Sequence, residues 1–379
     1  MPTPEETVAN VAAIAAVWRT ERAERQARRH LERADFDALR EAGFLALVVP
    51  SSAGGTWVDA ATSGRVVCEC LRVLAGADPS VALVSAMHPS VVGFWLSTPD
   101  AAGDDAWRAQ RASVFASAAA GEQWATITSE PGSGGDIART KATARAAGDG
   151  FLVSGDKHFG SGSGIADHMI TTAVAEGETA PSMFVLAARD QPWDGSTGWQ
   201  LLAEWDGVGM SATQSHAMRL RDAPGFRLAF DGPIETITLA AGPFIASLFT
   251  AVVVGVLEEA VGLARAQLGP KADSLRAYEK VEWARAEQDA WVAVQAYEGA
   301  LRAIESGDAV AAGRGALRAK EAVADLAESS LLRICRVVGG GSFSARSPFA
   351  HWFEDVRALG FLRPPWGLAY DLLYLTSFL

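Results

Sequence analysis

Residues 124–164 read WATITSEPGSGGDIARTKATARAAGDGFLVSGDKHFGSGSG, and this stretch decides the fold. β-Branched residues alternate with other residues along this stretch, and two breaks rich in Gly, Ser and Pro interrupt them at 129–136 and 157–162. This is the pattern of short strands joined by tight turns. Glycines let the main chain approach a ligand closely, so the first break predicts a binding loop. In the second break Phe159 stands two residues before Ser161, and strand alternation predicts that both side chains point the same way.

Helical patterns flank this β segment on both sides. Before it, apolar residues recur at three- and four-residue steps, and Asp78-Pro79 marks a helix start. Within it, alternation and Gly-rich turns predict a small antiparallel barrel or sandwich. We therefore predict an α+β fold with three domains, namely an N-terminal helical domain (1–122), a middle β domain (123–235) and a C-terminal four-helix bundle (236–379).

The stretch 236–257 carries no charge and is long enough to raise the question of a membrane span. Proline is best placed in the first turn of a helix, so we expect a helix to begin at Pro243 and to be too short to cross a bilayer. The stretch is then the buried central helix of a bundle.

The composition excludes several classes of partner. The chain has 379 residues, with 33 Lys plus Arg against 45 Asp plus Glu and a formal net charge of −12. An acidic chain is not attracted to nucleic acid or to an anionic membrane surface. Cys68, Cys70 and Cys335 form neither an even disulfide framework nor a paired metal-ligand spacing, which predicts reduced thiols in a cytoplasmic protein without a metal site.

The two Gly-rich breaks carry a resemblance to a known family. TSEPGSGGD resembles the T/S-E-P-x-x-G-S-D signature of the acyl-CoA dehydrogenase superfamily, and GDKHFGSG resembles its G-x-K-x-[WF]-x-[TS]-x-G element. EWDGVGMSATQS is similar to a further strand-pair motif of that family, and the likeness covers nearly the whole chain. The resemblance implies helices, then a β domain, then a helical bundle, and it implies bound FAD, with FMN or diffusible reduced flavin as alternatives.

The resemblance also implies roles for individual residues. The first motif lies along the pyrimidine edge of the flavin, and the second places an aromatic ring on the isoalloxazine and a hydroxyl at its N5. RVVGGG resembles a segment that contacts the flavin dinucleotide of a neighbouring subunit, so a homodimer or homotetramer is expected. The expected flavin-binding residues are Thr126, Thr128, Ser129, Phe159, Ser161, Arg336, Gly339 and Gly340.

Four further positions bear on the reaction. His88 lies in an apolar helix, where a lone histidine is usually a core residue, but the family often has a histidine near the substrate here. Arg363 stands where dehydrogenases of the family carry the catalytic Glu, and Val252 stands where another branch keeps it. Arginine cannot accept a proton at any working pH. Gly135 replaces a serine that meets the CoA arm in relatives.

These departures favour a flavin monooxygenase that uses oxygen on a small organic substrate. Such an enzyme needs no base for an α proton and would receive reduced flavin from a reductase. In this interpretation the catalytic residues are His88, Ser161 and Arg363. Two alternatives stay open: an acyl-CoA dehydrogenase with a displaced base, Glu258 or Glu259, and a catalytically silent flavoprotein that acts as a subunit.

Overall fold

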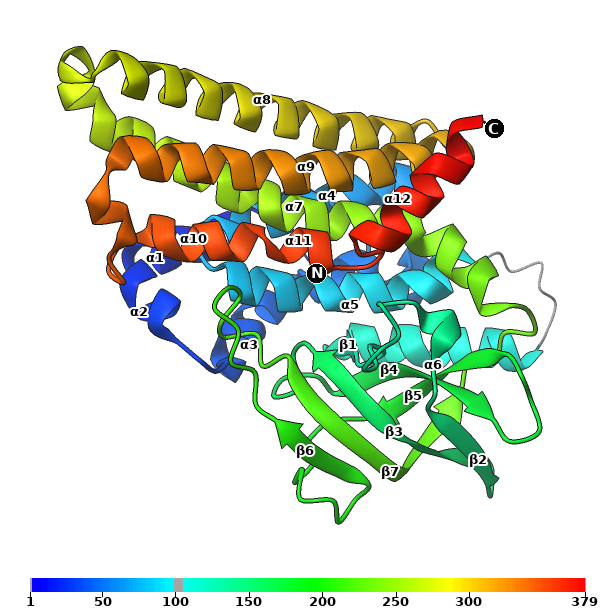
Figure 1. The fold of residues 1–379 in the computed structure, drawn as a ribbon. Coiled ribbons are helices and arrows are strands. Elements are labelled where there is room, and N and C mark those ends of the chain that lie inside the picture. Colours follow the sequence, from blue (N-terminus) through cyan, green and yellow to red (C-terminus); the bar gives the residue numbers. More distant parts are fainter. Residues whose placement is uncertain (1, 99–104, 379) are drawn as a thin grey trace.

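The computed structural model describes residues 2–98 and 105–378. A β domain is covered on one side by several layers of long helices, and both chain ends lie in the helical part (Figure 1). The first helices are α1 (Pro4–Thr20), α2 (Arg22–Ala27), α3 (Arg33–Glu41), α4 (Ala60–Ala75), α5 (Pro79–Ser97) and α6 (Asp105–Ala119). The later helices are α7 (Ile234–Leu268), α8 (Ala277–Glu305), α9 (Ala309–Val338), α10 (Pro348–Val356), α11 (Ala358–Phe361) and α12 (Trp366–Leu375).

Side-chain caps begin the N-terminal helices. Thr3 and Glu6 form a capping box on α1, and Asp59 accepts a hydrogen bond from the Thr62 N–H at the start of α4. The predicted Asp78-Pro79 start is confirmed, because Asp78 Oδ1 accepts from the Val81 N–H at 3.0 Å and α5 follows. All but two residues of α5 are buried, so this helix forms the centre of the N-terminal part.

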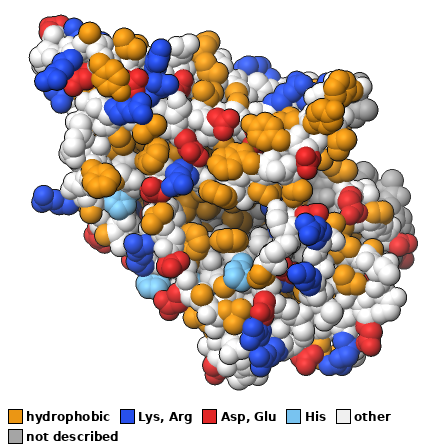
Figure 2. Space-filling view, viewed as in Figure 1, with side chains coloured by type: hydrophobic (Ala, Val, Ile, Leu, Met, Phe, Trp, Pro, Cys, Tyr) orange, Lys and Arg blue, Asp and Glu red, His pale blue; other side chains and the backbone are white. Residues whose placement is uncertain are grey.

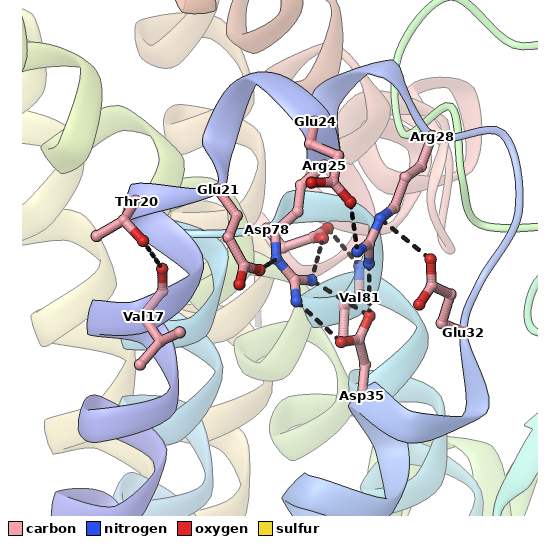
Figure 3. Close-up of polar contacts among 10 residues, drawn as sticks. All are labelled: Val17, Thr20, Glu21, Glu24, Arg25, Arg28, Glu32, Asp35, Asp78 and Val81. Carbon is pink, nitrogen blue, oxygen red and sulfur yellow. Dashed lines mark hydrogen bonds and ion pairs between the residues drawn. The ribbon is translucent and has the colours of Figure 1, made fainter.

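Asp78 also belongs to a buried charge network that joins the first helices to α5 (Figure 3). The Arg25 guanidinium lies 2.9 Å from Asp35 Oδ1 and 3.1 Å from Asp78 Oδ2, and it stacks over the Trp18 ring at 3.9 Å. Burial opposes the charged form of Arg25, but these carboxylates raise its pKa on balance. The network fixes α2 and α3 against the N-terminus of α5, the helix that borders the candidate site described below.

The β domain is a sheet that closes on itself. Its main path runs β1-β4-β2-β3-β7-β5, β6 adds to β7, and a further pairing of β4 with β5 joins the ends of the ring. Most pairs are antiparallel as predicted, but β4 runs parallel to β1 and to β2. The strands are β1 (Trp124–Thr126), β2 (Thr143–Ala147), β3 (Gly150–Gly160), β4 (His168–Ala175), β5 (Pro181–Ala187), β6 (Trp199–Ala203) and β7 (His216–Arg227).

The central helix α7 differs from the prediction. It runs without interruption from Ile234 to Leu268, so Pro243 lies inside it and does not begin it. A proline removes one backbone hydrogen bond but packing of both flanking segments can hold the helix together, and here residues 246–257 are buried on every side. Among the described residues α5 and Ile234–Ser274 are long and apolar enough to span a membrane, but 89% and 67% of their most apolar windows are buried inside the protein. This is the pattern of core helices.

The predicted fold class is confirmed, since helical segments precede and follow a β domain. The element borders lie between Ala119 and Trp124 and between Arg227 and Ile234. The division into three domains at residues 122 and 235 stays a proposal. Figure 2 shows a hollow on one face between the helical layers and the β domain.

Candidate functional site

A buried ion pair fastens the two Gly-rich loops to each other. Lys157 Nζ lies 2.5 Å from Glu130 Oε1, and the lysine is fully buried. Thr140 Oγ1 and the Lys141 N–H also donate to this carboxylate, and Lys157 donates to the Thr172 carbonyl at 2.6 Å. Burial alone would raise the pKa of Glu130, but Lys157 and the other donors lower it on balance. Both loops are therefore held in one geometry relative to each other.

The prediction that the side chains of Phe159 and Ser161 point the same way is wrong. Phe159 adopts φ +56°, and the pairing of β3 with β7 shifts register between Lys157 and Gly160. The strand ends at Gly160, so the period of two does not extend to Ser161. The Phe159 ring is 59% exposed and its centroid lies 6.1 Å from that of Trp205, edge to face, whereas Ser161 is turned inward and buried. The aromatic face is free to stack on a planar ligand.

Ser161 belongs to a chain of three hydroxyl groups, which we call the hydroxyl relay. Ser161 Oγ lies 2.8 Å from Ser215 Oγ, Ser215 Oγ lies 2.7 Å from Thr213 Oγ1, and Thr213 Oγ1 donates to the Met210 carbonyl at 2.9 Å. All three hydroxyl side chains are buried. Sequence reasoning missed Thr213 and Ser215, although the strand-pair motif contains their T-x-S spacing.

Three distant segments position the loop that carries the relay. Asp355 Oδ1 in α10 accepts from the Met210 N–H at 2.6 Å, and Ser80 Oγ in α5 accepts from the Ala212 N–H at 3.2 Å. The Leu31 N–H donates to Gln214 Oε1 at 3.2 Å. Burial raises the pKa of Asp355 to about 7. The relay therefore depends on contacts from both helical parts of the chain.

Arg363 reaches into the site from the segment between α11 and α12. Its guanidinium donates to Ser129 Oγ at 3.0 Å, and burial lowers its pKa to about 10. In the described part of the chain no carboxylate forms an ion pair with it. Gly135 explains how the segment fits, because a Cβ at this position, where φ is +81°, would lie 2.8 Å from the Pro365 ring. Gly135 and Pro365 thus pack where a serine would clash.

The remaining residues of the first motif line an open edge. Thr126 and Thr128 are partly exposed and alternate with the buried Ala125 and Ile127, so both hydroxyls are on the same side of the chain. Neither threonine side chain has a hydrogen-bond partner among the described residues. These two free hydroxyl groups lead along the chain to Ser129, whose hydroxyl accepts from Arg363.

His88 has the geometry of a core residue, and its catalytic role stays a prediction that these surroundings do not favour. Its ring is fully buried, Nε2 lies 3.3 Å from the Leu45 carbonyl, and Nδ1 accepts from the Trp124 N–H at 3.3 Å. Both nitrogens are occupied by backbone groups, so the imidazole is the neutral Nε2–H tautomer and has no free atom to offer a ligand. Burial lowers its pKa to about 4.

This burial predicts a pH-dependent stability. The unfolded chain binds a proton at this histidine near its ordinary pKa of 6.5, and the folded chain binds it only near 4. The contribution of His88 to stability should therefore be complete above the unfolded pKa and be lost as the pH drops through this window, by about 3 kcal/mol in total. Asp355, whose pKa is raised to about 7, contributes with the opposite sign over the same range. Urea unfolding of the unmodified protein and of His88→Gln at several pH values isolates the histidine, because the difference between the two slopes is its contribution. Equal slopes in the two proteins would contradict the assignment.

Arg336, Gly339 and Gly340 lie away from these loops, at the end of α9. Arg336 Nη1 lies 3.0 Å from Glu282 Oε2, and Gly339 ends the helix with φ +87°. These residues were expected to meet the flavin of a neighbouring subunit, and that role stays a prediction.

The closed β domain lies between two helical parts and presents the exposed Phe159 ring next to its Gly-rich loops. Residues 125–223 match the family model "Acyl-CoA dehydrogenase, middle domain". The amino sugar nitrososynthase DnmZ of Streptomyces peucetius is 28% identical over 348 residues, which are 87% of this chain and 82% of that protein. The probable FMNH2-dependent monooxygenase SfnC of Pseudomonas putida is 29% identical over 247 residues, 62% of this chain and 56% of that protein.

A solved structure shares the fold. The structure of KijD3 in complex with FMN and a dTDP-linked amino-deoxysugar superposes with a TM-score of 0.84 at 24% identity. The match covers 100% of this chain and 94% of the KijD3 chain. Over residues 125–223 the chain is thus similar to the middle domain of acyl-CoA dehydrogenases, and its fold is that of this FMN-bound structure. The comparisons confirm the predicted class of enzyme, a flavin-dependent oxidoreductase, and they confirm the preference for a reaction that uses oxygen.

Proposed function

We propose that this protein is a flavin monooxygenase that binds reduced FMN from a separate reductase and oxygenates a small organic substrate. A bound reduced flavin supplies the electrons that activate oxygen, which requires no side chain to remove an α proton. The observation that carries the proposal is Arg363, a cation that donates to Ser129 where the resemblance places the catalytic carboxylate of a dehydrogenase. A location in the cytoplasm belongs to the same proposal.

The residues of the site fit a flavin. Phe159 offers an exposed ring for stacking, and the free hydroxyls of Thr126 and Thr128 suit the polar edge of a heterocycle. Ser129 can accept as well as donate, and Arg363 attracts negative charge. A cavity of about 250 Å³ opens beside the Trp205 ring. Its lining residues are Arg29, His30, Glu204, Trp205, Asp206 and His216.

The alternative of a dehydrogenase with a displaced base loses its two candidates. Glu258 is held by Arg72 in two hydrogen bonds of 2.6 Å, and Glu259 accepts from Arg19 and Arg22. Both carboxylates are thus engaged by arginine side chains of the N-terminal helices. Val252 is a buried core residue with no titratable group. We therefore place the dehydrogenase below the monooxygenase.

The proposal is tested by adding reduced FMN to the protein without oxygen and then admitting air. We expect the protein to bind reduced FMN and to change the rate at which the flavin is reoxidised. A protein that neither binds reduced FMN nor alters its reoxidation would overturn the proposal and favour a catalytically silent subunit.

Ser161 provides a separate prediction about the same site. Ser161→Ala removes one hydrogen-bond partner of the flavin and should weaken flavin binding by about 0.5–1.5 kcal/mol. Folding should be nearly unchanged, because the Ser215 hydroxyl keeps its contact with Thr213. Titration of the flavin fluorescence gives the affinity, and urea unfolding gives the stability. An unchanged flavin affinity, spectrum and reoxidation rate would contradict the placement of Ser161.

We also propose that the protein is a homodimer or a dimer of dimers. The central helix α7 is not available for an interface over residues 246–257, because all of them are buried within one chain. Large apolar side chains are exposed on the outer helices instead, and Figure 2 shows orange side chains gathered on the helical part of that face. The exposed residues are Tyr278, Val281, Trp291, Val310, Leu332, Phe343, Tyr370, Tyr374 and Leu375.

Light scattering at micromolar concentration should give at least twice the mass of one chain. Trp291→Glu, on a ring that is 64% exposed, should weaken the assembly. Val58→Glu is the matched control, since Val58 is 65% exposed but lies outside these helices. A monomeric mass for the unmodified protein would contradict the prediction.

A further inference from the structure

The guanidinium of Arg363 has donors that the protein leaves unused. It lies on the segment between α11 and α12, and its Nη2 donates to Ser129 Oγ at 3.0 Å. A guanidinium carries several further N–H donors, and in the described part of the chain none of them meets a protein acceptor. The side chain is only partly exposed, but none of its unpaired nitrogens is enclosed by the protein. The free donors therefore open onto solvent-accessible space beside the first Gly-rich loop.

The carboxylates whose charge acts on Arg363 are engaged elsewhere. Burial lowers the pKa of Arg363 to about 10, against the opposing effect of Asp136 and Glu130. Glu130 is bound by Lys157 at 2.5 Å, and Asp136 Oδ1 accepts from the Ala138 N–H at 2.9 Å. Neither carboxylate forms an ion pair with the guanidinium. A partly buried cation without a paired counter-ion is stabilised when an anion binds it.

Ser129 adds a second donor at the same place. Its hydroxyl accepts from Arg363 and makes no other hydrogen bond among the described residues, so its own proton is free to donate. Pro365 fixes the arginine segment against the loop, because its ring lies where Gly135 has no side chain and a Cβ would approach to 2.8 Å. A cation and a hydroxyl donor thus lie side by side, and such a pair recognises an oxyanion.

We propose that Arg363 and Ser129 bind an oxyanion group of the organic substrate, such as a carboxylate or a sulfonate. The inference rests on the proposed function, because it names the class of its substrate. The formal net charge of −12 repels anions at long range, so an anionic substrate needs a local cation of this kind. FMN also carries an oxyanion, in its phosphate group, and the test therefore compares the two sources.

Phenylglyoxal, which modifies arginine side chains, tests the site in the unmodified protein. The reagent attacks the neutral form of the side chain, so the lowered pKa of Arg363 favours its modification. Peptide mass spectrometry measures the rate at each arginine. Propionate at about ten times its dissociation constant should slow modification of Arg363 about tenfold, because only the free protein reacts. Inorganic sulfate should also protect, and propionamide, the neutral counterpart of propionate, should not. Arg139, an exposed arginine of the same loop region, is the internal control.

Variants test the same site by calorimetric titration with propionate. Arg363→Gln keeps hydrogen-bonding capacity but loses the charge, and it should weaken propionate binding at least about tenfold. Ser129→Ala should weaken it about two- to tenfold, and Arg363→Lys should retain part of the affinity. Arg139→Gln is the matched control, since it removes the same charge from an exposed position and should leave the affinity unchanged. Urea unfolding shows whether each variant is folded.

The outcomes separate this inference from the function on which it rests. Equal modification rates of Arg363 with and without propionate would overturn the inference, while a changed reoxidation of reduced FMN would still support the monooxygenase. Protection by FMN but not by riboflavin, which has no phosphate, would assign the site to the cofactor and also overturn the inference. Protection by both flavins with no further slowing by propionate would do the same, because the ring system would then cover the arginine. Protection by propionate in a protein that leaves FMN reoxidation unchanged would support the oxyanion site and overturn the proposed function.

Discussion

Acyl-CoA thioesters should fail to reduce the flavin of this protein, whatever the length of the acyl chain. Desaturation requires a base within hydrogen-bond reach of the α proton, and its loss typically costs about 10²- to 10⁴-fold in rate. The position expected for that base holds Arg363, which stays protonated with a pKa of about 10. Contact of Pro365 with Gly135 also closes the turn that meets the CoA arm in relatives. The measurement is anaerobic mixing with short, medium and long acyl-CoAs while the absorbance of oxidised flavin is followed.

Chemical reduction of the same sample is the control, because it shows that the bound flavin can accept electrons. Arg363→Ala tests whether the arginine merely blocks an existing base. This variant should remain inactive, since Glu258 and Glu259 are paired with arginines of the N-terminal helices. Rapid bleaching by any acyl-CoA would contradict the monooxygenase proposal and return Glu258 or Glu259 to the role of base.

The fold could be predicted from the sequence because its signals are local. The switch from a helical period to alternation near residue 123, and the Asp78-Pro79 helix start, are each encoded within a few residues. The interior of α7 could not be predicted in this way. Pro243 is a reliable local signal for a helix boundary, but in this protein tertiary packing along the central helix outweighs it.

The candidate site was predicted only where short motifs encode it. Ser129, Phe159 and Ser161 lie within the two Gly-rich breaks and were found there. Thr213, Ser215 and Asp355 act through contacts that join positions far apart in the chain, such as the bond between the Asp355 carboxylate and the Met210 N–H. His88 shows the converse, since its residue type indicated chemistry but burial and two backbone partners leave it no free atom.

Breaking the buried ion pair between the two motif loops should produce the largest loss of stability. Lys157→Met leaves the Glu130 carboxylate buried without its cation, and such a change typically costs roughly 3–5 kcal/mol. Thr140 and the Lys141 N–H still donate to Glu130, but they do not neutralise it. Urea unfolding of the flavin-free protein at neutral pH measures the effect. Flavin binding should weaken as well, because Phe159 follows Lys157 by two residues.

The double variant Lys157→Met with Glu130→Gln distinguishes a lost charge pair from a packing defect. It removes both charges and should recover a large part of the lost stability. Lys141→Met is the matched control, since its exposed side chain lies in the same loop region and should change stability by no more than about 0.5 kcal/mol. The single variant should also lose less stability at acidic pH, because protonation of Glu130 removes the unpaired charge. A Lys157→Met protein as stable as the original would show that the ion pair does not hold the two loops together.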